Sequence, residues 1–157
     1  MENIMKVFRV TLIIMLAFTA TLNAQLVNQE NGSGEKEGKW VKYFDNNSVK
    51  YEGQFHLGKP YGKFVYYYKN GDIKAVSEFE DNGTIANNIT YYKSGKLMAE
   101  GKFVNQKKVG VWKYYLDQES NALVSTEKYS NGVLNGESIT YYPNTDQPTE
   151  IVMFKNG

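Results

Sequence analysis

Tyrosine recurs along this chain at a nearly constant spacing. Five marker tyrosines stand at Tyr43, Tyr67, Tyr91, Tyr115 and Tyr141, so that the first three intervals are equal and the last is slightly longer. Self-similarity at a fixed period is typical of proteins built from tandem copies of one supersecondary unit. The spacing therefore predicts five copies of about 24 residues, with the two extra residues of the fourth copy placed between Asp117 and Ala122.

Other positions repeat with the same period. Glycine stands five residues before the marker tyrosine in four copies, and Ala86 replaces it in the third. An aromatic residue closes the second half of every copy, at Phe55, Phe79, Phe103, Tyr129 and Phe154. We therefore expect one repeat domain, residues 38–157, divided into copies 38–61, 62–85, 86–109, 110–135 and 136–157.

Local chemistry predicts that each copy is a β-hairpin. In the second copy, Asn70-Gly71 separates two β-rich stretches, Phe64–Lys69 and Ile73–Phe79, and this dipeptide accepts positive φ at both turn centres. No helical stripe with a period of about 3.6 residues is sustained. Because Tyr66, Tyr67 and Tyr68 are consecutive, aromatic side chains must point to both faces of the sheet. The predicted fold is all-β: an elongated antiparallel sheet of about five tandem hairpins.

Residues 1–24 have the pattern of a secretory signal peptide. Lys6 and Arg9 precede an apolar run, Val10–Phe18, which is far shorter than the roughly 20 residues of a membrane-spanning helix. We expect a signal-peptide helix, cleavage near Ala24, and a periplasmic or extracellular location for the exported protein. An uncleaved N-terminal anchor is the alternative. Residues 25–37 are polar, which indicates a linker or an N-terminal cap.

Composition argues against several classes of function. Without residues 1–24 the chain is formally neutral, and its single arginine, Arg9, lies in the signal, so nucleic acid is not an expected partner. The lack of a basic cluster also argues against membrane lipid as a partner.

The residues that carry most enzyme chemistry are scarce. His56 is the only histidine, which excludes any site that needs two imidazoles, and the absence of cysteine excludes a thiolate nucleophile or ligand. We therefore expect no catalytic residue, no cofactor and no metal site. Glu52 and Glu100, at equivalent places two copies apart, are expected to pair with lysines on neighbouring strands.

Several segments resemble a known repeat. Tyr51–Gly62 is similar to the MORN motif, with its Tyr-x-Gly-x-aromatic core and downstream glycines, and Gly38–Phe44 and Tyr91–Phe103 are similar to its bacterial variant. Asn88 and Ser138 depart from this pattern, since the variant has tryptophan there. The resemblance implies a β-hairpin array used for protein or lipid contacts. Bacterial relatives are often labelled antitoxins, but a cytoplasmic antitoxin would not need an export signal.

Two classes of function remain. The first is an exported, non-catalytic module for protein–protein interaction or scaffolding at the cell envelope, whose last strand leaves a sheet edge open for a protein partner or a second copy. The alternative is a module that binds a glycan or another envelope component by stacking it on exposed aromatic rings. The candidate contact surface comprises Trp40, Tyr66, Tyr68, Tyr92, Trp112, Tyr114 and Tyr142.

Overall fold

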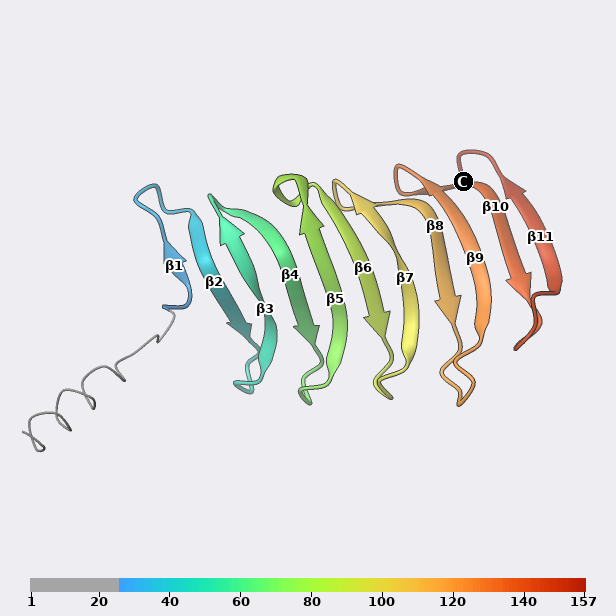
Figure 1. Ribbon diagram of the computed structural model, residues 1–157, viewed down its shortest axis with the longest axis horizontal. Coiled ribbons are helices and arrows are strands. Elements are labelled where there is room, and N and C mark those ends of the chain that lie inside the picture. Colours follow the sequence, from blue (N-terminus) through green and yellow to red (C-terminus); the bar gives the residue numbers. More distant parts are fainter. Residues whose placement is uncertain (1–25) are drawn as a thin grey trace, which may run out of the picture.

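The computed structural model describes residues 26–157, which form one open antiparallel sheet in which the strands follow one another in chain order (Figure 1). The predicted signal-peptide helix and its cleavage site lie outside the described residues. The strands are β1 (Gln29–Glu30), β2 (Lys36–Tyr43), β3 (Val49–His56), β4 (Lys59–Tyr67), β5 (Ile73–Glu80), β6 (Ile85–Tyr91), β7 (Leu97–Val104), β8 (Lys107–Tyr115), β9 (Leu123–Ser130), β10 (Val133–Tyr141) and β11 (Pro148–Phe154). The predicted all-β array of tandem hairpins is confirmed.

Two kinds of turn connect the strands. Within a copy the turn is closed by backbone hydrogen bonds, as at Gly71, whose φ is 95° and whose N–H donates to the carbonyl oxygen of Tyr68 at 3.0 Å. Between copies, two-residue turns such as Asn105-Gln106 have positive φ at both positions, 49° and 64°. That geometry matches the twist of paired strands and is easiest for asparagine and glycine. Between β5 and β6 a short 3₁₀ turn, Asp81–Gly83, takes its place.

Five hairpins follow one another along the sheet, from β2–β3 to β10–β11. The segment before them also joins the sheet, because β1 pairs with β2, which itself begins at Lys36. The indole N–H of Trp40 donates to the carbonyl oxygen of Gln29 at 3.0 Å. The N-terminal segment therefore caps the edge of β2. The expected extra residues between Asp117 and Ala122 lie in the longer loop between β8 and β9.

One face of the sheet carries a zigzag of aromatic rings, here called the ring row: Trp40, Phe55, Phe64, Phe79, Phe103, Trp112 and Tyr129. Successive centroids lie 6.0 Å apart for Trp40–Phe55, 5.2 Å for Phe55–Phe64, 5.0 Å for Phe64–Phe79 and 4.8 Å for Phe103–Trp112, all with edge-to-face geometry. Such pairs stabilise beyond the area that they bury. The core of this single-layer sheet is therefore this row together with the small side chains beside it.

Marker tyrosines form hydrogen bonds on the opposite face. Tyr67 donates its hydroxyl to Glu52 at 2.7 Å, and Tyr115 donates to Glu100 at 2.8 Å. Both carboxylates also meet lysines of neighbouring strands, with Glu52 3.4 Å from Lys39 and Glu100 3.2 Å from Lys113. The predicted pairing of these glutamates with lysines is confirmed, and so is the presence of aromatic residues on both faces. At these two positions the marker tyrosine therefore forms a hydrogen bond to the last strand of the preceding copy.

Candidate binding surface

Glycine creates the space for two of the buried rings. Gly53 and Phe64 lie beside each other on neighbouring strands, as do Gly101 and Trp112, and each ring covers the backbone of its glycine. A Cβ added at Gly53 would stand 2.4 Å from the Phe64 ring, and one at Gly101 would stand 2.3 Å from the Trp112 ring. Any larger residue would displace the ring. Glycine at these two positions is therefore a packing requirement of the ring row.

The arrangement changes between β5 and β6. Ser77 occupies the position of the glycine and Asn88 the position of the ring, and they are direct partners across the two strands. The Asn88 side-chain amide donates to the Ser77 hydroxyl at 2.7 Å, and both residues are buried, at 9% and 5% exposed. These two side chains bond to each other, but together they are much smaller than an aromatic ring above a glycine. A gap in the ring row between Phe79 and Phe103 results.

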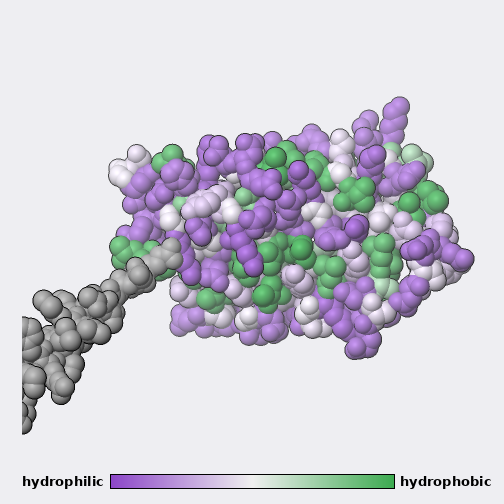
Figure 2. Space-filling model, in the orientation of Figure 1, coloured by the Kyte–Doolittle hydropathy of each residue, from purple (hydrophilic) through white to green (hydrophobic). Residues whose placement is uncertain are grey.

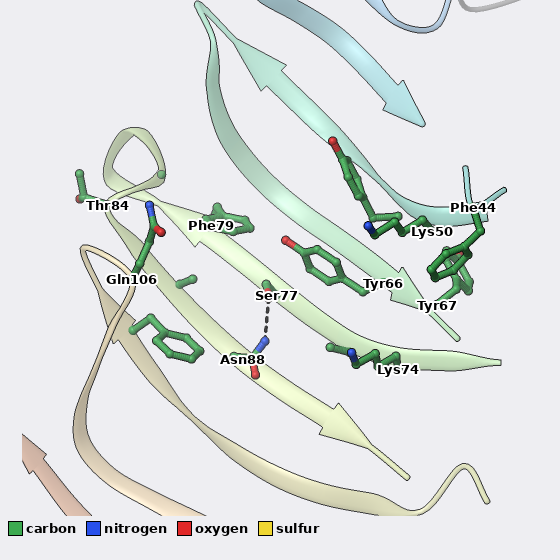
Figure 3. A pocket seen from close by; sticks show the side chains of 15 residues that line it. Phe44, Lys50, Tyr66, Tyr67, Lys74, Ser77, Phe79, Thr84, Asn88 and Gln106 are labelled. Carbon is green, nitrogen blue, oxygen red and sulfur yellow. Dashed lines mark hydrogen bonds between the residues drawn. The ribbon is translucent and has the colours of Figure 1, made fainter. Parts of the chain in front are cut away.

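The gap opens into a hollow of about 690 Å³ on the ring-row face. Its floor consists of small residues, among them Ala75 and Ala86, and its aromatic walls include Tyr66, Phe79 and Phe103. Figure 3 shows Lys50, Lys74 and Phe44 at one end, Tyr66, Ser77 and Asn88 in the middle, and Thr84 and Gln106 at the other end. A concave, mostly apolar surface of this volume is of the size that binds ligands or partner side chains.

Two lysines are the only charged side chains that line this hollow among the described residues. Lys50 Nζ lies 5.7 Å from the centroid of the Phe44 ring and Lys74 Nζ lies 5.9 Å from that of Tyr68. Within residues 26–157 neither lysine takes part in an ion pair. One end of the hollow is therefore positively charged, with no carboxylate in its described lining to offset that charge.

A second cluster of titratable groups lies on the same face around Lys108. Its ammonium stands 4.6 Å from the Trp112 ring centroid and 4.7 Å from that of Tyr129, and it donates to the Tyr114 hydroxyl at 2.7 Å. Burial lowers the pKa of Lys108 and raises the pKa of Tyr114, and Tyr129 donates to Glu127 at 2.6 Å. The polar groups of this cluster bond to one another, and the Lys108 side chain covers the neighbouring rings. The cluster is therefore not a candidate binding site.

The predicted contact residues fall into different environments. Tyr142 is exposed at 56%, and Tyr66 lines the hollow. Tyr68 and Tyr92 connect neighbouring copies. The Tyr68 hydroxyl donates to the carbonyl oxygen of Tyr91 at 2.7 Å, and the Tyr92 hydroxyl donates to that of Tyr115 at 2.8 Å. Tyr114 belongs to the Lys108 cluster and Trp40 bonds to β1.

Trp112 is the one predicted contact residue that is buried. It was expected to present an exposed ring, but it is only 3% exposed because it fills the space above Gly101. Its indole N–H donates to the carbonyl oxygen of Lys102 at 3.2 Å. The expectation of exposure is wrong for this residue, because the glycine on the neighbouring strand lets the ring lie flat against the sheet.

The hollow itself was not predicted from the sequence. Its signal is the coincidence of three substitutions on two neighbouring strands: Ala86 for glycine, Asn88 for an aromatic residue, and Ser77 for the glycine that would lie beneath it. Each of these substitutions can be recognised in the sequence when the copies are aligned. Their combined effect depends on the register, which places Ser77 opposite Asn88 and Phe79 opposite Ala86.

Within residues 26–157, no three histidine, cysteine or acidic side chains are grouped as metal ligands. In the same range, no helix has the length and apolar character needed to cross a membrane. Figure 2 shows apolar residues gathered over the middle of the sheet and bordered by hydrophilic ones.

Comparison with known proteins agrees with this architecture. The family model described as the MORN repeat variant matches residues 36–56, 60–81 and 86–105, which are the hairpins β2–β3, β4–β5 and β6–β7. No curated protein matches the chain significantly. The MORN family is generally a non-catalytic repeat module for protein or membrane interaction. With three matched copies in register with its hairpins, the chain is a MORN repeat protein.

Proposed function

We propose that this chain is an exported, non-catalytic module that binds a protein partner at the cell envelope through its ring-row face. The observation that carries the proposal is the hollow between Phe79 and Phe103, an apolar concavity of about 690 Å³ that interrupts the row of rings in the middle of the sheet. Apolar concave surfaces that accept a partner's side chains are where interfaces concentrate their binding energy.

Export is supported by the sequence pattern of residues 1–24 alone. The corresponding test is the intact mass of the protein recovered from the envelope or the medium of its own cells. The expected mass is that of a chain beginning near Gln25. Recovery of the full-length chain in the cytoplasm only would contradict this part of the proposal.

Site-specific photo-crosslinking in the exporting cells tests the binding role. A crosslinking amino acid at Thr84, on the rim of the hollow, should capture a defined protein, whereas the same group at Glu137, an exposed residue away from it, should not. Equal capture from both positions, or none from Thr84, would contradict the proposal. Recovery of glycan rather than protein would favour the alternative of a carbohydrate-binding module.

Self-association through β11 is the second candidate. In the part of the chain that the structure describes, β11 pairs only with β10, and its Ile151 and Met153 side chains are exposed at 57% and 68% on one face. An edge strand with exposed apolar side chains is a template for strand pairing. Because β1 caps the other end of the sheet, two copies would join β11 to β11 by a twofold axis.

Sedimentation of the purified protein over a wide concentration range tests this second candidate. A concentration-dependent dimer should be lost when Ile151→Lys places a charge on the edge, while Val133→Lys, at another exposed position outside β11, should leave it unchanged. A monomer at every concentration would exclude self-association.

A further inference from the structure

We infer that the hollow between Phe79 and Phe103 receives an aromatic side chain of the protein partner, with an acidic residue beside it in the partner's chain. This inference rests on the proposed function and specifies what that function recognises. It follows from the geometry of the ring row, the composition of the floor, and the charges at one end.

The ring row lacks one ring where the hollow lies. Phe64 stands between Phe55 and Phe79 with edge-to-face contacts to both, at 5.2 and 5.0 Å. By the same register, a ring at Asn88 would stand between Phe79 and Phe103, and Phe103 already has such a contact with Trp112 at 4.8 Å. A partner's aromatic ring in this place would continue the alternation that Phe64 and Trp112 provide on either side of it.

The floor is adapted to an apolar group rather than to a sugar. Ala75 and Ala86 are buried and present methyl groups, and the two polar side chains, Ser77 and Asn88, are bonded to each other. A glycan needs hydrogen-bond partners for many hydroxyl groups, and a floor of this kind leaves those hydroxyls without partners. An aromatic ring needs none, so the floor discriminates between them.

The two lysines at one end of the hollow indicate which residue of the partner lies beside its aromatic side chain. Lys50 and Lys74 stand at one end of the hollow, and Met98 and Val124 hold the equivalent places in the next two copies, so this pair of lysines is particular to the hollow. The two lysines repel a cationic group and attract a carboxylate. At the opposite end Thr84 stands where the next copy has Lys108, so that end is neutral.

The size of the hollow favours a peptide over a single small ring. A phenyl ring fills only part of about 690 Å³, which leaves space for the backbone and an acidic neighbour of an extended segment. The positive end would bind the acidic side chain while the ring occupies the gap between Phe79 and Phe103.

Nuclear magnetic resonance of the ¹⁵N-labelled protein provides the test, with the Asn88 side-chain amide as a reporter at the floor. The probe is the peptide acetyl-Asp-Glu-Phe-Glu-Asp-amide. Saturable shifts of Asn88 and of the backbone amides of Ser77 and Ala86 are expected, with a dissociation constant of about 1 mM or below. Replacing the probe's phenylalanine by alanine should abolish the shifts. Replacing its acidic residues by lysine should weaken binding about tenfold.

Variants of the protein test whether the probe binds in the hollow or elsewhere on the sheet. Ser77→Gly with Asn88→Trp recreates the kind of glycine–ring pair that Gly101 and Trp112 form and should abolish binding of the probe. Ala86→Leu fills the floor from a second position and should do the same if the double variant does not fold. Lys50→Glu with Lys74→Glu should weaken binding about tenfold, while Lys63→Glu with Lys102→Glu on the other face should leave it unchanged.

Several results would overturn the inference. These are the absence of saturable shifts, equal binding of the alanine probe, binding that survives the filled hollow, and displacement of the probe by phosphatidylglycerol vesicles that themselves bind through the hollow. The two proposals fail separately. A protein crosslinked at Thr84 together with a probe that does not bind would refute only this inference, whereas a bound probe without any crosslinked protein would refute only the proposed function.

Discussion

Substituting Gly101 by alanine adds one methyl group at the most crowded point of the ring row. The added Cβ would stand 2.3, 2.4 and 2.6 Å from three ring atoms of Trp112. The ring has little freedom to move, since it is 3% exposed, packs on Phe103 and donates to the Lys102 carbonyl oxygen. The backbone of Gly101 is not in the left-handed region, so alanine is acceptable there apart from this contact.

The expected cost follows from these contacts. Overpacking a filled core costs about 1–3 kcal/mol, and displacing the indole also loses a hydrogen bond with a net value of about 1 kcal/mol. Restricting the unfolded chain offsets about 0.4–1 kcal/mol. Gly101→Ala should therefore lower the free energy of unfolding by about 2 kcal/mol. With Trp112→Ala present, the contact is absent, and the same substitution should stabilise by about 0.5 kcal/mol.

A double-mutant cycle measures this coupling. Urea unfolding followed by circular dichroism on the parent, both single variants and the double variant should give a coupling of about 2.5 kcal/mol. Gly53→Ala with Phe64→Ala is an independent repetition in the neighbouring pair of copies, where the distance is 2.4 Å. A cost for Gly101→Ala that is the same with and without the Trp112 ring would refute the reasoning, because the ring would then not be what excludes the methyl group.

Tyr92→Phe should lower the free energy of unfolding by about 1 kcal/mol in urea, because it removes the bond to the Tyr115 carbonyl, while Tyr142→Phe, an exposed tyrosine, should change it little. The hydrogen bonds from Tyr67 and Tyr115 hold the pKa of Glu52 and of Glu100 below 4.5, so their stabilisation is present above that pH and is lost as pH falls through the lowered values. Thermal unfolding should show less acid destabilisation between neutral pH and about pH 3 in Glu52→Gln with Glu100→Gln than in the parent, and an equal loss would contradict this. The bond to Glu52 raises the pKa of Tyr67 to about 12, so an absorbance titration should show one tyrosine shifted back toward 10.0 in Glu52→Gln.

The sequence was sufficient to predict the architecture because the information is local and repeated. Turn dipeptides such as Asn70-Gly71 fix each hairpin, and the marker tyrosines show that the hairpins follow one another at a nearly constant spacing. The pairing of Glu52 and Glu100 with lysines was predictable for the same reason, since equivalent positions in a tandem array have equivalent neighbours.

The period of the repeat and the all-β array of hairpins could be predicted from the chain alone, whereas the residues that form a surface are set by contacts made in the folded sheet. Trp112 is buried and Tyr68 and Tyr92 connect copies because cross-strand neighbours, which lie far apart in the chain, set exposure and hydrogen bonding. The hollow depends on the same kind of neighbour, as Ser77, Asn88 and Ala86 leave a ring-sized gap only when register brings them together between Phe79 and Phe103. Each of the three substitutions can be read from the sequence, but the space that they leave forms only when the strands pair.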